Sequence, residues 1–247
     1  MRLSVLGACG AWPQAGEACS GFLVEHDGFR LLLDLGYATV PRLLRRIPAE
    51  QVDAVFVSHG HPDHCADLNP LLRARALGGR SSSPLPIYAP AGALDAVLAL
   101  DRPGMLDDTY VVHDVLPGAL FELGPFRAET RLLPHWEPNA GIRLVADGRA
   151  FAYTGDAGPS RHVVDLAREV DLLVAEATYP DHVPDHSRRY LSSARTAGRQ
   201  AAEASADHLL LTHLWPGTDP QIALAAAAET YGGTLDVAVS DFTVDLA

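Results

Sequence analysis

The most informative segment of this chain reads Ser58-His59-Gly60-His61-Pro62-Asp63-His64. It closes a short apolar run, residues 54–58, that predicts a strand. Four side chains of the segment could bind a metal, and its glycine and proline permit the tight turn that brings alternate side chains to a common point. Imidazole and carboxylate donors without thiolate suit zinc, manganese or iron at catalytic sites. The segment therefore predicts a metal site just after the end of a strand.

A site for two metal ions needs more donors than this loop contains, and other strand ends supply them. His135 follows a predicted strand over 126–133, Asp156 follows one over 150–154, and His213 follows one over 209–212. Any one of these residues alone would read as an ordinary polar residue at a strand end. Their joint occurrence, in the order that such a site requires, predicts that they complete it.

The second half of the chain repeats the organisation of the first. Residues 21–34 predict two strands joined by His26-Asp27-Gly28, and an Asp-Gly pair between apolar runs is a strong hairpin signal. Residues 142–154 predict the same hairpin around Asp147-Gly148. In both halves a Val-Asp pair and an apolar run then lead to Pro-Asp-His. We expect two similar halves, with chance likeness between two strand-helix units as the alternative.

Strands alternate with helices in both halves, and helices are predicted over 68–76 and 91–100. Further strands are predicted over 3–6 and 85–88. The hairpins interrupt the strand-helix-strand rhythm of a purely parallel sheet. The expected fold class is therefore α/β, with two mixed sheets packed face to face and helices outside, in one domain over residues 1–247.

Composition limits the class of partner. The 19 basic residues are all arginine against 31 acidic residues, so Schiff-base and P-loop lysine chemistry are excluded. The net charge of −12 argues against nucleic acid as a partner and leaves a small-molecule substrate. The three cysteines, Cys9, Cys19 and Cys65, predict neither a disulfide framework nor a thiolate zinc site. This cysteine usage makes a reducing, cytoplasmic location the default expectation.

The sequence predicts no membrane partner. The apolar run before Leu6-Gly7-Ala8-Cys9 is shorter than a secretory signal requires, so we interpret it as a first strand that enters a glycine-rich turn. No apolar run approaches the roughly 18 residues of a membrane span.

In these residues the chain resembles the metallo-β-lactamase-fold hydrolases, and within them the branch of ribonuclease Z and related phosphodiesterases. The resemblance covers essentially the whole chain. The motifs that carry it are Leu6-Gly7-Ala8-Cys9-Gly10, Leu33-Asp34-Leu35-Gly36, His59 to His64, His135, Thr154-Gly155-Asp156 and Leu211-Thr212-His213-Leu214. It implies a four-layer αββα sandwich of two similar halves, in agreement with the internal repeat, and a homodimer is compatible with it because many relatives are dimers.

The resemblance also implies a role for each candidate ligand. His59, His61 and His135 would hold one divalent metal ion, Asp63, His64 and His213 would hold a second, and Asp156 would bridge the two. Asp34 would be a buried group that orients the histidines. Zinc is the expected metal, with manganese or iron as alternatives.

The repeat assigns two further residues. In the second half, alanine and tyrosine replace the first two histidines of the segment, so His182 is not expected to bind a metal despite its Pro-Asp-His context. Glu176 stands at the position equivalent to Ser58 and is expected to support the site from behind the ligands.

Two departures from ribonuclease Z bear on function. Those enzymes carry a histidine, thought to protonate the leaving group, before a Leu-Thr or Leu-Ser pair, whereas this chain reads Arg189-Tyr190-Leu191-Ser192. His186, Tyr190 or a metal-bound water is the candidate for that role, with a solvated loop residue as the alternative reading of His186. The long arm that grips transfer RNA is also missing, so tRNA 3′ processing is not the expected activity.

The expected function is a binuclear metal-dependent hydrolase in which a metal-bridging hydroxide attacks a small phosphodiester or related ester, with Asp63 as the residue that orients the hydroxide. Acyl hydrolysis of a lactone, thioester or β-lactam is the alternative, because the same hydroxide can attack a carbonyl. A non-catalytic metal-binding module is the alternative from another class, although such proteins usually lose ligands and all seven are present.

Overall fold

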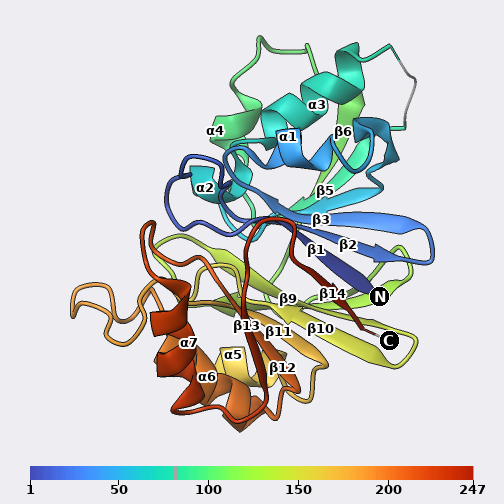
Figure 1. Cartoon of the computed structure of the whole chain (residues 1–247). Helices are drawn as coiled ribbons and strands as arrows, with labels where there is room; N and C mark the ends of the chain where they lie inside the picture. The colour runs from blue at the N-terminus through green and yellow to red at the C-terminus, as the bar shows by residue number, and fades with distance from the viewer. Residues whose placement is uncertain (80–82, 247) are drawn as a thin grey trace.

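In the computed structural model, which describes residues 1–79 and 83–246, two β-sheets lie face to face between outer helices (Figure 1). Within the described residues each sheet has seven strands. The first sheet has the order β14 (Thr243–Asp245), β1 (Arg2–Gly7), β2 (Gly21–His26), β3 (Phe29–Leu35), β4 (Ala54–Phe56), β5 (Leu85–Ala89) and β6 (Tyr110–Asp114). The second has the order β13 (Thr234–Val237), β12 (His208–Thr212), β11 (Leu172–Glu176), β10 (Arg149–Tyr153), β9 (Asn139–Ala146), β8 (Phe126–Leu133) and β7 (Leu120–Leu123).

Helices cover the outer face of each sheet, which gives the four layers that the resemblance implies (Figure 1). The first sheet is covered by α1 (Thr39–Leu43), α3 (Leu68–Leu77) and α4 (Asp95–Leu98), and the second by α5 (Arg161–Leu166), α6 (Ala194–Ala204) and α7 (Pro220–Ala228). The short helix α2 (Pro62–Cys65) and the 3-10 turns η1 (Ala49–Gln51) and η2 (Asp107–Thr109) complete the elements of the first half.

Three apolar clusters hold these layers together. The central cluster joins the inner faces of the two sheets, with Phe22 and Phe56 from the first sheet and Phe126 and Phe151 from the second. Along β8 the side chains alternate between buried and more exposed positions, as expected for a strand with one face against a core. The other two clusters lie under the helices of each outer layer.

The predicted repeat is present in the topology. An antiparallel hairpin followed by parallel pairings occurs as β2, β3, β4 and β5 in the first sheet and as β9, β10, β11 and β12 in the second. The repeat extends to side chains. Asp53 accepts the backbone N–H of Arg30 at 2.8 Å, and Asp171 accepts that of Ala150 at 2.7 Å. The same aspartate-to-backbone hydrogen bond in both halves favours a shared organisation over chance similarity.

Both Asp-Gly hairpins have the turn geometry that their sequence predicts. The φ angles are 48° and 79° at Asp27 and Gly28, and 49° and 75° at Asp147 and Gly148. Positive φ at both central residues is the type I′ turn that suits the twist of a hairpin.

The structure corrects one predicted helix. The helix expected over 91–100 is reduced to α4, because Gly92 takes a left-handed φ of 78° and the preceding residues form a turn. The strand expected over 54–58 ends at Phe56, which leaves the histidine segment in a loop. None of the helices in the described part of the chain has the length and apolar character that crossing a bilayer requires.

Candidate metal centre

The seven predicted ligands converge at one place between the two sheets. They come from the loop after β4, which holds His59 and His61, from α2, which holds Asp63 and His64, and from the loops after β8, β10 and β12, which hold His135, Asp156 and His213. Because β8, β10 and β12 run in the same direction within one sheet, their ends meet at one edge.

Three imidazoles and one carboxylate form a first group that could hold a metal ion. Its members are His59, His61, His135 and Asp156, and their ligand atoms all lie within 4.8 Å of one another. Nδ1 of His61 is 3.0 Å from Nε2 of His59 and 3.1 Å from Nε2 of His135. The Oδ2 atom of Asp156 is 4.0 Å from each of those Nε2 atoms.

A second group shares Asp156 with the first. Its members are Asp63, His64, Asp156 and His213, again with ligand atoms within 4.8 Å of one another. Nε2 of His213 is 3.1 Å from Oδ2 of Asp63 and 3.2 Å from Oδ2 of Asp156, while Nε2 of His64 is 3.2 Å from Oδ1 of Asp156. Asp156 therefore belongs to both groups.

The donor atoms fit a metal ion. Nε2 of His64 and Oδ1 of Asp156 are buried and face each other at 3.2 Å, yet neither makes a well-aligned hydrogen bond within the described residues. Leaving buried polar atoms unpaired costs free energy, so such atoms mark a place where a ligand belongs. Nitrogen and carboxylate oxygen donors without sulfur suit a divalent transition metal, and the three cysteines, all within the described residues, are free.

Each histidine of the two groups has a polar neighbour at its other ring nitrogen, within hydrogen-bond distance for all but His61. The partners are Ser58 Oγ for His59 at 3.0 Å, Glu137 Oε1 for His61 at 3.8 Å, Asp34 Oδ2 for His64 at 2.7 Å, the Tyr190 carbonyl for His135 at 2.9 Å and Thr178 Oγ1 for His213 at 3.0 Å. These partners fix the ring orientation, which leaves the inward nitrogen directed at the site. Sequence reasoning missed Glu137, the Tyr190 carbonyl and Thr178.

Asp34 is buried and accepts four hydrogen bonds. Its carboxylate accepts from the Ser58 N–H at 2.7 Å, the Ser58 hydroxyl at 2.8 Å, the Tyr153 hydroxyl at 2.6 Å and the His64 ring at 2.7 Å. In this way it positions both the start of the histidine segment and one ligand, which is the orienting role expected of it.

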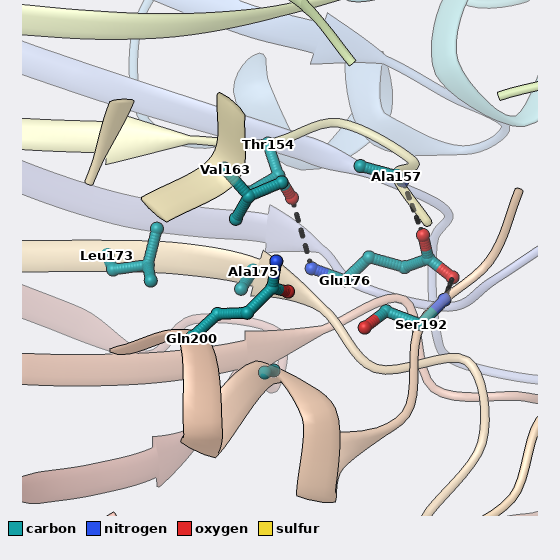
Figure 2. A pocket seen from close by; sticks show the side chains of 9 residues that line it. Thr154, Ala157, Val163, Leu173, Ala175, Glu176, Ser192 and Gln200 are labelled. Atoms are coloured by element: carbon teal, nitrogen blue, oxygen red, sulfur yellow. Dashed lines mark hydrogen bonds between the residues drawn. The ribbon is translucent and has the colours of Figure 1, made fainter. Parts of the chain in front are cut away.

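Glu176, which stands in the second half at the position equivalent to Ser58, is buried at the end of β11 (Figure 2). Its carboxylate accepts from the Thr178 hydroxyl at 2.6 Å and from the backbone N–H groups of Ser192 and Ala157. The Thr178 hydroxyl, having donated to Glu176, accepts from Nδ1 of His213 and so directs Nε2 at the site. Burial, with the nearby charge of Asp156, raises the pKa of Glu176 to about 8.

The small pocket in Figure 2 lies behind Glu176 rather than at the centre. Its volume is about 10 Å³, and its lining includes Val163, Leu173 and Gln200. A space of this size holds at most one water molecule, so it is part of the packing and not a substrate site.

The histidine pKa values divide into two kinds. Burial lowers the pKa of His59 and His135, which favours neutral rings that can bind a metal. Burial also opposes charge on His64 and His213, but the adjacent carboxylates, Asp156 first, outweigh it and raise both pKa values. Burial works against ionisation of Asp63 as well, yet His64 and His213 hold its pKa below the ordinary value.

A pocket of about 290 Å³ opens onto the centre. Its lining includes His61, Asp63, His135, Asp156 and His213 together with Trp136, Tyr179, Trp215 and His186. His186, one candidate for the general acid, thus lies at the pocket, whereas Tyr190, the other candidate, is not among the described lining residues. His182 is 90% exposed and pairs with Asp181, as expected of a residue outside the site.

Comparison with known proteins agrees with the geometry. The family model described as "Beta-lactamase superfamily domain" matches residues 27–214. The probable metallo-hydrolase YhfI of Bacillus subtilis is 32% identical over 250 residues, covering 98% of both chains. A crystal structure of YhfI, titled a metallo-beta-lactamase fold protein, superposes with a TM-score of 0.90 at 29% identity and 98% coverage of both chains. Ribonuclease Z of Haloferax volcanii is 28% identical, covering 96% of this chain and 92% of its own.

Proposed function

The chain belongs to the beta-lactamase superfamily of metal-dependent hydrolases, and we propose that within it the protein hydrolyses small phosphodiesters at a centre of two divalent metal ions. The observation that carries this proposal is the pair of His/Asp groups that share Asp156 at the base of an open pocket. Two sites with a common carboxylate are the arrangement that serves in-line displacement at an ester. Zinc is the metal we propose.

The positions of the seven side chains suggest which metal ion each of them would bind. His59, His61 and His135 would hold one ion, Asp63, His64 and His213 the other, and Asp156 both. When bound, two such ions supply a water of lowered pKa and offset negative charge on the phosphoryl oxygens.

Asp63 is the residue that orients the attacking water. Its carboxylate lines the pocket, and the neighbouring His64 and His213 lower its pKa below the ordinary value. The backbone N–H of Ala11 donates to Oδ2 of Asp63 at 2.8 Å and fixes the carboxylate in place. A fixed acceptor raises the reaction rate because it aligns the nucleophile with the bond that is attacked.

His186 is the residue that would protonate the leaving group. It lines the pocket and is solvent-exposed, so its ring is free to exchange protons with water between turnovers. We do not propose Tyr190 as the general acid, because its carbonyl accepts a hydrogen bond from His135 and its ring packs on Trp136.

The charge of the molecule favours a small substrate over an RNA. The net charge is −12, and no arginine lines the pocket among the described residues. A polyanion needs clustered cations along its backbone, whereas a single phosphodiester needs only the metal ions. The similarity to ribonuclease Z therefore supports cleavage of a phosphodiester bond, but it does not make an RNA the expected substrate.

Metal analysis of the purified protein and a substrate panel test the proposal. We expect two equivalents of metal, and turnover of bis(4-nitrophenyl) phosphate in preference to chromogenic lactone, thioester and β-lactam substrates. The Asp156→Ala variant should lose bound metal and turnover together, since its carboxylate belongs to both groups. The Asp108→Ala variant is the matched control, because that carboxylate is exposed in η2 and belongs to neither group of the centre.

Three results would contradict it. Faster turnover of a lactone, thioester or β-lactam than of the phosphodiester would indicate that the enzyme is an acyl hydrolase. Metal binding without turnover of any class would indicate a binding module. An active, metal-loaded Asp156→Ala variant would remove the assignment of the centre itself.

A further inference from the structure

All three tryptophans of the chain lie around the mouth of the pocket. Trp12, Trp136 and Trp215 are 44%, 51% and 38% exposed, although tryptophan is normally buried over most of its surface. Trp136 and Trp215 line the pocket, and Trp12 contacts Trp215. Exposed apolar surface gathered at one place marks a binding site rather than chance.

One wall of the mouth consists of Trp12, Tyr179 and Trp215, here called the Trp215 wall. The ring centroids of Trp12 and Trp215 are 5.0 Å apart with the planes at 87°, and those of Tyr179 and Trp215 are 6.0 Å apart with the planes at 14°. Edge-to-face and stacked contacts of this kind stabilise the positions of the rings.

A second wall is formed by Trp136, with Tyr190 packed against it from outside the pocket lining, and this pair is here called the Trp136 wall. Their ring centroids are 5.1 Å apart, and Trp136 also lies 5.2 Å from the ring of His135. The two walls therefore stand next to ligands of the centre, His135 for one and His213, two residues before Trp215, for the other.

The backbone of both walls is tied to the centre. Ala11, which precedes Trp12, has a left-handed φ of 60° and donates its N–H to Asp63. The N–H of Trp215 donates to the carbonyl of Thr178 at 3.1 Å, and the carbonyl of Tyr190 accepts from His135. A strained turn held by a candidate ligand indicates a conformation kept for function. The rings are thus fixed before a substrate arrives, which lowers the entropy cost of binding.

Among the described residues, the pocket lining offers aromatic rings but no arginine, while outside the lining the Arg189 guanidinium lies 5.8 Å from the ring centroid of Tyr190. The chain has no lysine, and none of the arginines within the described residues lines the pocket. A substrate held by metal ions at one anionic centre and by flat apolar surfaces elsewhere carries one charge and an aromatic group.

We propose that the Trp215 and Trp136 walls bind a flat aromatic group, an aryl ring or a nucleobase, on a singly charged phosphodiester. This inference rests on the proposed function and adds the substrate class to it. The aromatic group stacks on a wall while the phosphodiester lies at the metal centre. Aromatic stacking contributes enough to change specificity about tenfold.

Two matched substrates test the inference in the metal-loaded enzyme. 4-Nitrophenyl phenylphosphonate and 4-nitrophenyl methylphosphonate carry the same charge and the same leaving group and differ only in the phenyl ring. We expect kcat/KM to be about tenfold higher for the phenyl compound. Trp215→Leu or Trp136→Leu should bring the ratio toward one, while the corresponding Phe variants should retain most of it. Tyr110→Leu is the control, since this ring is outside the pocket lining.

Tryptophan fluorescence supplies a second readout that does not depend on turnover. Because all three tryptophans are at the mouth, diphenyl phosphate should quench the emission where dimethyl phosphate at the same concentration does not. Thymidine 5′-(4-nitrophenyl phosphate) distinguishes the source of the ring: a kcat/KM above that of the phenyl compound assigns a nucleobase, and one below it assigns a simple aryl group.

The outcomes separate this inference from the proposed function. Turnover with a phenyl-to-methyl ratio near one, or with a ratio that neither Leu variant changes, would overturn the aromatic site and leave the hydrolase intact. Quenching by diphenyl phosphate without turnover of any phosphodiester would reject the proposed function and retain the aromatic site.

Discussion

Each histidine of the centre presents one ring nitrogen to the site, while a polar neighbour lies beside the other. Four of these neighbours are within hydrogen-bond distance, and Asp34 is the one that also accepts from a strand end and from the facing sheet through Tyr153. The geometry of the centre is therefore set by residues that a metal ion would never touch.

The Asp34→Asn variant tests this dependence. An amide offers one acceptor where the carboxylate offers two, so at least one of the four donors around Asp34 loses its partner. We expect metal affinity to fall about 10- to 100-fold and the free energy of unfolding to fall by about 1–3 kcal/mol. Competition with a chromogenic chelator and chemical denaturation measure the two effects. Tyr153→Phe, which removes a single donor, should show a smaller loss, and equal affinity in Asp34→Asn and the wild type would contradict the assignment.

The His186→Ala variant tests the general acid. Protonation matters only when the leaving alcohol is a poor leaving group, so kcat should fall about 10²- to 10⁴-fold for a phosphodiester with an alkyl leaving group. For bis(4-nitrophenyl) phosphate, whose leaving group departs as the phenolate, the change should be small. Tyr190→Phe keeps the backbone carbonyl that holds His135 and serves as the control. Equal losses of kcat on both substrates would indicate that His186 acts in binding or folding instead.

At the scale of elements, the centre depends on how closely β3 and α2 approach. A Cβ atom added at Gly36, just after β3, would lie 1.8 Å from the backbone oxygen of Asp63 in α2. Only glycine permits this contact between the end of a strand and the helix that carries two ligands.

The Gly36→Ala variant should therefore displace α2. We expect a loss of about 3 kcal/mol or more in the free energy of unfolding, together with weaker metal binding, because backbone cannot move aside as a flexible side chain does. Gly28→Ala is the matched control: its φ is 79° but nothing lies within 4 Å of the added atom, so only backbone strain of about 1 kcal/mol is expected, with metal binding intact. Denaturant titration and metal analysis compare the two variants. Equal metal affinity in both would show that the close approach is unimportant.

The elements that sequence reasoning predicted are those with a local chemical signature. Asp27-Gly28 and Asp147-Gly148 predicted both hairpins, because few other dipeptides take positive φ twice. The edge strand β6 was not predicted, since most of its side chains are exposed and show no alternation. Strand β14 was missed because its pairing with β1 joins the two ends of the chain, and no local pattern encodes it.

The same distinction applies to the centre. His59, His61, Asp63 and His64 are close in sequence, and the distant ligands were found because each follows an apolar run. The backbone carbonyl of Tyr190 has no signature in the sequence, because every residue type offers one. Glu137 and Thr178 are ordinary loop residues until the fold brings them beside His61 and His213. The resemblance to a known family supplied the division of ligands, and the residues alone left it open.

At the scale of the whole molecule, the centre joins the two halves. The loop after β4 and α2 belong to the first half, while His135, Asp156 and His213 come from the second. Each candidate metal group contains residues of both halves, so a bound ion would link the two sheets in addition to any role in catalysis. Removing the metal should therefore lower the stability of the entire fold.

Chelation at two pH values tests this link, and the sign follows from His64 and His213. In the metal-free centre their pKa values are raised above the ordinary 6.5 because Asp156 and Asp63 face them. Their protonation stabilises the metal-free fold fully below pH 6.5, and this contribution is lost as the pH rises through the raised pKa values. Protons also compete with metal ions for the same nitrogen atoms, so metal binding strengthens as the pH rises.

The difference in thermal midpoint between metal-loaded and chelated protein should therefore be larger at about pH 8 than at about pH 5.5. With free metal about 1,000-fold above its dissociation constant, stabilisation of about 4 kcal/mol corresponds to a gap of about 8–16 °C. Differential scanning fluorimetry with and without chelator measures the gap. A difference in thermal midpoint that becomes smaller as the pH rises would show that the two histidines do not exchange protons for metal.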